Sequence, residues 1–216
     1  MGRQTADLIR HLAADSAAVR PLPRPWTRTA VWLGVSLLYV AALYGIWLPD
    51  ASIRSDAGFV TEQLAAMTTG VLAALAAFAS VVPGYSRRLA YASLVPLAVW
   101  LSSLGQSCAR DWAASASLSP IGTHWACFPV TVVVGLVPAS LLIVMLRRGA
   151  PVAPRLTSAL SGLAAASLAN VAIRFVHTAD ASVIVLLWHV LAVFALSSVL
   201  TVVANHVFTW RRTSSA

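Results

Sequence analysis

The sequence predicts an all-α integral membrane protein, a bundle of six transmembrane helices preceded by a short amphipathic helix. The chain has 216 residues, of which 59% are hydrophobic and 10% are charged, and its mean hydropathy is +0.80. Soluble domains have about 45–50% apolar and about 25% charged residues. Because one span needs about 20 apolar residues, six spans leave no room for a separate soluble catalytic domain.

Six apolar stretches are long enough to cross a bilayer. They cover, in order, about residues 30–48, 60–82, 89–106, 127–146, 156–176 and 181–208. The first exceeds the apolar core of a signal peptide and follows a long polar leader, so we expect it to be retained. The sequence therefore divides into an N-terminal helix and spacer (1–28), a membrane domain (29–210) and a tail (211–216).

The distribution of basic residues predicts that both termini are cytoplasmic. All 15 basic residues are arginines. Twelve lie in the N-terminal segment, the C-terminal tail and the connections on the same side of the membrane, and Arg54, Arg110 and Arg174 lie on the other side. An excess of basic residues in short segments marks the cytoplasmic side of a membrane protein.

Residues 5–18 predict a short cytoplasmic helix with one apolar edge. Thr5 can cap its start, and Leu8, Ile9 and Leu12 recur at helical spacing. A helix this short is marginal in water on its own. Its apolar edge therefore needs a surface to bury against.

Three surfaces could cover this edge: lipid headgroups, the bundle itself or another protein. Arg3 and Arg10 suit anionic lipids, so composition alone favours the membrane surface. Residues 20–26, with prolines at every second position from 21, predict an extended spacer between the helix and the first span.

Small residues and tryptophans predict how the spans pack and where they end. Small residues recur four apart in the second and fifth spans, at Ala66, Gly70 and Ala74 and at Ser158, Gly162 and Ala166. Such faces allow close helix packing. Tryptophans near span ends favour the membrane interface; these are Trp47, Trp100, Trp112, Trp125 and Trp210.

Patterns typical of membrane enzymes are absent from the sequence. It has no HExxH, no protease-type glutamate pair, no phosphatase-type Arg/Ser/His set and no glycine-rich phosphate loop, so we expect no enzymatic activity. Arg174, His189 and Asn170 fall in or near the spans, and Arg174 is close enough to the outer end to snorkel. Such sparse polarity argues against a transporter.

Two cysteines, Cys108 and Cys127, flank one predicted outer connection. A bridge would close a loop of about 20 residues, worth about 3 kcal/mol in the chain-entropy model. A structural disulfide and a sensing pair both remain open, since Arg110 could favour the Cys108 thiolate. A metal site would also need His124 and His177, and the spacing resembles no zinc motif, so we expect neither metal nor cofactor. Residues that could tune the thiols are Arg110, Asp111, His124 and His177.

Five short patterns occur in order along the chain. They are Asp-Leu-Ile-Arg-x-Leu-Ala-Ala-Asp at 7–15, Val-Pro-Gly-x-Ser-Arg-Arg at 82–88, Cys-x-Arg-Asp-Trp at 108–112, Arg-Arg-Gly-Ala-Pro at 147–151 and Asp-Ala-Ser-x-x-x-x-x-Trp-His at 180–189. With the six spans, the set resembles the NrsF family of bacterial inner-membrane anti-sigma factors.

The resemblance implies a protein that holds an extracytoplasmic-function sigma factor inactive and releases it on stress, with periplasmic cysteines taking part in sensing. The implied sigma-binding residues are Asp7, Leu8, Ile9, Arg10 and Leu12, with Arg87, Arg88, Arg147 and Arg148 as loop contacts. The implied sensing residues are Cys108 and Cys127. Family members can carry a cysteine directly after the histidine of the last outer loop, where this chain has Thr178. Either Cys108 substitutes for that cysteine or the sensing chemistry differs.

Two other functions compete with this interpretation. An integral-membrane thiol oxidoreductase would use the two cysteines, but the sequence has no Cys-x-x-Cys and no second pair to relay electrons. A small transporter would need more polarity within the spans. Both alternatives leave the N-terminal helix without a partner.

Overall fold

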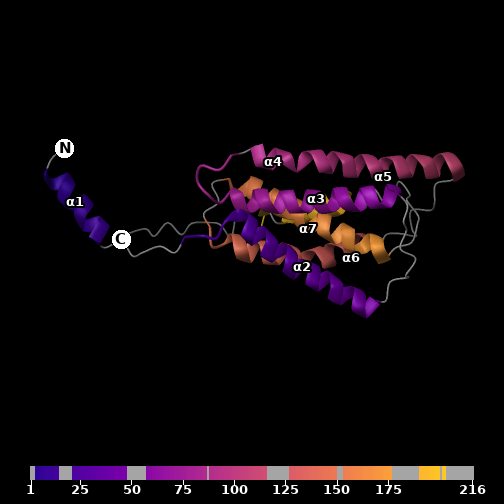
Figure 1. Ribbon diagram of the computed structural model, residues 1–216, viewed down its shortest axis with the longest axis horizontal. Helices are drawn as coiled ribbons and strands as arrows, with labels where there is room; N and C mark the ends of the chain where they lie inside the picture. The colour runs from indigo at the N-terminus through magenta and orange to yellow at the C-terminus, as the bar shows by residue number, and fades with distance from the viewer. Residues whose placement is uncertain are drawn as a thin grey trace.

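The computed structural model describes residues 3–14, 21–47, 57–86, 88–115, 127–149, 153–176, 190–199 and 201–202 (Figure 1). Its labelled helices are α1 (Arg3–Ala14), α2 (Pro25–Trp47), α3 (Ala57–Ala79), α4 (Arg88–Ala92), α5 (Leu94–Ser115), α6 (Cys127–Leu146) and α7 (Pro154–Val176). A further helix covers Val190–Val199. This part of the chain contains no strand, which confirms the all-α prediction.

Five segments are long and apolar enough to cross a membrane, namely α2, α3, α4 with the first part of α5, α6 and α7. The sixth predicted span, 181–208, is represented by the shorter apolar helix Val190–Val199. Most of its remaining residues lie outside the described part of the chain. The count of six spans therefore stays a prediction.

Prolines explain where several helices begin. α2 starts at Pro25 and α7 at Pro154, both earlier than predicted. Proline suits the first helical position because the N–H that it lacks would have no partner there. Pro96 deprives the carbonyl of Ala92 of its helical partner, and the chain accordingly breaks at Ser93 between α4 and α5.

The N-terminal segment differs from the prediction in its boundaries. α1 begins at Arg3, so Thr5 lies within the helix and does not cap it. Residues 15–20 lie outside the described part of the chain. Residues 21–24 have no regular structure, but Trp26 and Arg28, assigned to the spacer and its border, belong to α2.

α7 is the most buried span of the bundle, and α3 beside it contacts each of the helices α2, α4, α5, α6 and α7 (Figure 1). In the most apolar part of α7, 83% of the residues are buried inside the bundle, compared with 17% in the span formed by α4 and the first part of α5. We call the end where α2 and α7 begin and α3 and α6 finish the proximal end, and the opposite end the distal end. α1 stands apart from the bundle, beyond the proximal end.

The predicted small-residue faces do pack closely. A Cβ added at Gly70 of α3 would lie 3.3 Å from the Cβ of Ser167 in α7. One added at Gly162 would lie 2.8 Å from the backbone nitrogen of Ser197, and closer still to its Cα. Gly70 therefore permits the contact of α3 with α7, and Gly162 the contact of α7 with Val190–Val199.

Trp100, predicted to mark a span end at the membrane interface, packs between helices. It is buried in a cluster with Ala65, Ala66, Leu104 and Val171, between α5, α3 and α7. α5 continues to Ser115, beyond the predicted end of the span at residue 106, so Trp100 lies well inside the helix.

Candidate functional site at the proximal end

The first candidate surface is the apolar edge of α1. Leu8, Ile9 and Leu12 are 59%, 54% and 65% exposed. On the other side of this helix, Arg10 Nη2 lies 3.1 Å from Asp7 Oδ1, in an ion pair one turn apart. The structure thus presents three large aliphatic side chains with nothing packed over them.

The second candidate surface is the arginine-rich proximal end of the bundle. Its described arginines are Arg24, Arg28, Arg88, Arg147, Arg148 and Arg155, from the starts of α2, α4 and α7 and the turn after α6. Among the described residues of the bundle, no Asp or Glu lies at this end. Arg87, another predicted contact, lies outside the described residues.

Arg28 holds three helices together beneath this surface. Its buried guanidinium donates a hydrogen bond to the carbonyl of Met145 in α6. Its Cζ also lies 4.5 Å from the ring centroid of Phe78 in α3, a cation–π contact. Sequence reasoning missed this role, although an arginine in the first turn of an apolar span was the available signal.

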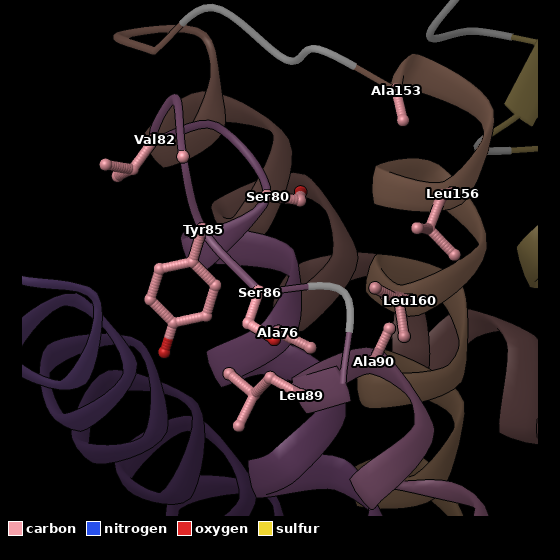
Figure 2. Close-up of a pocket in the computed structure, with 11 residues that line it drawn as sticks. Ala76, Ser80, Val82, Tyr85, Ser86, Leu89, Ala90, Ala153, Leu156 and Leu160 are labelled. Atoms are coloured by element: carbon pink, nitrogen blue, oxygen red, sulfur yellow. The ribbon is translucent and has the colours of Figure 1, made fainter.

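A cavity of about 110 Å³ opens beside the arginines, between the end of α3, the turn that follows it, α4 and the start of α7. Figure 2 shows Tyr85 and Leu89 on one side and Leu156 and Leu160 on the other. Ser80 also lines the cavity, with Oγ 2.7 Å from Thr157 Oγ1. The cavity is large enough for one apolar side chain of a partner.

The turn from Val82 to Tyr85 forms one wall of this cavity. The Tyr85 N–H donates to the Val82 carbonyl over 3.3 Å, and Gly84 between them has a φ of 83°. Pro83 in the second position and a positive φ in the third define a type II turn. The Val-Pro-Gly part of the pattern at 82–88 is therefore explained by backbone geometry.

Replacement of Gly84 by alanine should destabilise this turn, because a Cβ at positive φ costs about 1–2 kcal/mol. We expect a lower midpoint for unfolding of the purified protein by SDS in mixed micelles. Gly34→Ala is the matched control, since nothing lies within 4 Å of a Cβ built at this glycine of α2. An equal change in both variants would contradict the assigned turn.

The predicted sensing residues lie towards the distal end. Cys108 lies in α5 and Cys127 is the first residue of α6. The structure describes the backbone of both cysteines but not their side chains. The side chains of Arg110 and Asp111, and residues His124 and His177, also lie outside it. The described residues contain no group of three His, Cys, Asp or Glu able to hold a metal ion.

The distal end also corrects the prediction for Arg174. It does not extend to the outer surface but binds Glu62 of α3 through two hydrogen bonds, Nε to Oε1 at 2.8 Å and Nη2 to Oε2 at 2.9 Å. Glu62 is itself buried, although it lies only five residues from the start of α3. The bundle is therefore more polar inside than its hydropathy indicates.

Comparison with known families adds what the geometry alone does not give. The family model NrsF, described as negative regulator of sigma F, matches residues 12–210. The chain belongs to the NrsF family. As an NrsF family member it is a negative regulator of a sigma factor, and a sigma factor is its partner. No curated protein and no solved structure matches the chain.

The family match bears unevenly on the two candidate surfaces. It includes the whole proximal end of the bundle but begins at Leu12, near the end of α1. Residues 7–10 precede it, so their proposed role in NrsF function rests on the exposed edge of α1.

Proposed function

We propose that this NrsF protein is a non-enzymatic anti-sigma factor of the bacterial inner membrane. It retains an extracytoplasmic-function sigma factor through α1 and the proximal end, and releases it on a periplasmic signal through Cys108 and Cys127. The exposed apolar edge of α1 carries the proposal. The sigma-binding residues are Asp7, Leu8, Ile9, Arg10 and Leu12, with Arg87, Arg88, Arg147 and Arg148 as contacts from the bundle.

The charge distribution supports a cytoplasmic location for both surfaces. Short basic segments stay on the cytoplasmic side. Six of the eight described arginines of the bundle lie at the proximal end, whereas Arg110 and Arg174 lie towards the distal end. With the termini on this side, α1 is in the compartment where a sigma factor meets RNA polymerase.

The like charges of α1 and the proximal end argue against the bundle itself as the surface that covers the apolar edge. Arg3 and Arg10 outnumber Asp7 on α1, and the proximal end carries arginines without a described carboxylate. Like charges repel, so α1 is not drawn onto its own bundle. A sigma factor that buries Leu8 and Leu12 would be prevented from using the same surface to bind polymerase.

Burial of one large aliphatic side chain contributes about 1.5–3 kcal/mol. Loss of Leu8 and Leu12 should therefore remove about 3 kcal/mol or more, which is about a hundredfold in affinity. We expect the double variant Leu8→Asp, Leu12→Asp to lose sigma-factor binding and repression while its insertion into the membrane is unchanged.

The measurement is crosslinking in cells, purification of the tagged protein from membranes and identification of what is bound. The matched control is Ala6→Asp, Ala14→Asp, which adds the same charge to exposed positions of α1 away from its apolar edge. A sigma factor bound by the wild type and the control only is the expected result. Equal recovery with all three would exclude the α1 edge, and no recovery from correctly inserted wild type under working crosslinking would contradict the proposed function.

A further inference from the structure

The ion pair between Glu62 and Arg174 joins α3 to α7 inside the bundle. Its side chains are only 4% and 14% exposed, in that order. Glu62 follows the start of α3 by five residues and Arg174 precedes the end of α7 by two, which places the pair within about one and a half turns of the distal helix ends. It is the one ion pair within the described part of the bundle.

Charges in such a position are costly. Ionised side chains among apolar spans lose their hydration, and the cost is recovered only with good geometry and satisfied hydrogen bonds. The bidentate contact meets that requirement at both carboxylate oxygens. A hydrophobic pair would pack here without the desolvation cost, so the pair points to a role beyond holding the helices together.

Between its ends, the contact of α3 with α7 is made mainly by close packing of small side chains, and its hydroxyl groups do not link the two helices. Alanines and glycine line it on α3, including Ala66, Gly70 and Ala73. The hydroxyls of Thr69 and Ser167 donate to carbonyls one turn back in their own helices. Because these hydroxyl groups donate within their own helices, they do not form a hydrogen bond to the facing helix.

Polar contacts that join α3 to α7 are instead found near the two ends. The Glu62–Arg174 pair lies near the distal end, and the hydroxyls of Ser80 and Thr157, 2.7 Å apart, meet at the proximal end. Ser80 follows the last residue of α3 and lines the proximal cavity, which also receives Leu156 and Leu160 from α7 (Figure 2). Movement of α3 along α7 would therefore separate Ser80 from Thr157 and reshape the cavity.

We infer that Glu62 and Arg174 are positioning residues that set the register of α3 on α7, and through it the shape of the proximal surface. When the ion pair at the distal end opens, α3 can shift along α7, because the contact between the two helices is lined by small residues. Since the same helix ends at the turn that forms the cavity wall, the shift reaches the surface proposed to hold the sigma factor. The register claim stands without the proposed function, and only its effect on sigma-factor retention rests on it.

The register can be measured with cysteines at Ser80→Cys and Thr157→Cys, in a chain whose Cys108 and Cys127 are replaced by serine. Mild oxidation in isolated membranes gives the rate of disulfide formation between the two positions. We expect Glu62→Arg or Arg174→Glu to slow this rate about tenfold, a typical loss for coupled residues. The reversed pair Glu62→Arg, Arg174→Glu should restore it, because the opposite charges face each other again.

Two variants keep the result interpretable. Thr61→Ala, next to Glu62 but exposed and back-bonded to Ala57, should crosslink like the parent chain. Where a charge reversal reduces the yield of folded protein, Glu62→Gln tests the same pair with less disturbance. Wild-type crosslinking rates in Glu62→Gln, or in both single reversals, would overturn the inference.

Sigma-factor retention, measured by co-purification on the native-cysteine chain, separates this inference from the proposed function. The single reversals should weaken retention and the reversed pair should recover it. Leu8→Asp, Leu12→Asp should lose retention but keep the parent crosslinking rate between positions 80 and 157. A register shift in chains that never retain a sigma factor would support the register inference and contradict the proposed function alone.

Discussion

Replacement of Trp32 by alanine should destabilise the bundle by about 3–5 kcal/mol, the usual cost of removing a large buried aromatic side chain. Trp32 of α2 is fully buried against Phe78 of α3 and Leu142 of α6. Its Nε1 donates a hydrogen bond to the carbonyl of Pro138, 3.0 Å away in α6. The substitution therefore removes both an indole-sized volume of packing and a contact between helices.

The measurement is unfolding of the purified protein in mixed micelles at increasing SDS, followed by circular dichroism. Trp26→Ala is the control, because Trp26 lies on the same helix but is exposed. Trp32→Phe should fall between the two, since it keeps most of the volume and loses the hydrogen bond. A Trp32→Ala variant as stable as Trp26→Ala would show that α2 does not pack against α3 and α6 as described.

Replacement of Gly162 by alanine should cost about 3 kcal/mol, the upper end for an added carbon in a filled core. The new Cβ would lie 2.6 Å from Ser197 Oγ and 2.8 Å from its backbone nitrogen. Since backbone atoms cannot rotate away, Val190–Val199 would have to move off α7. The same unfolding assay should show a large loss of stability.

A glycine in open space provides the contrast. A Cβ at Gly105 of α5 has nothing within 4 Å, so Gly105→Ala should stabilise the helix by about 0.5–1 kcal/mol. Opposite signs at Gly162 and Gly105 are the expected result. The same sign at both positions would refute the close contact of α7 with the last described helix.

The sequence predicted the helices well because hydropathy is averaged over many residues. α6 has the bounds 127–146 expected from its apolar stretch, and α7 and α3 differ from the predicted ranges by a few residues. The small-residue faces were also predictable, since spacing along one helix shows which side can be approached closely.

Single residues that depend on a partner far along the chain were not predictable. Glu62 near the start of an apolar stretch is indistinguishable from a solvated acid until Arg174, 112 residues later, is placed beside it. From the sequence, Arg28 is one of the basic residues that mark the cytoplasmic side of the membrane. Only the structure shows that it contacts Met145 and Phe78. Hydropathy gives the length of a span, but not which side of it faces a neighbouring helix.

The separation of α1 from the bundle has a consequence for how tightly a partner is held. Ten residues, 15–24, join α1 to α2, a reach of at most about 30 Å if extended at about 3.1 Å per residue. A protein bound to α1 therefore meets the proximal arginines at an effective concentration of about millimolar. Two contacts of low affinity then together hold the partner with high affinity. The loss of either contact is enough to release the partner, so a small movement of the helices in the membrane has a large effect on transcription.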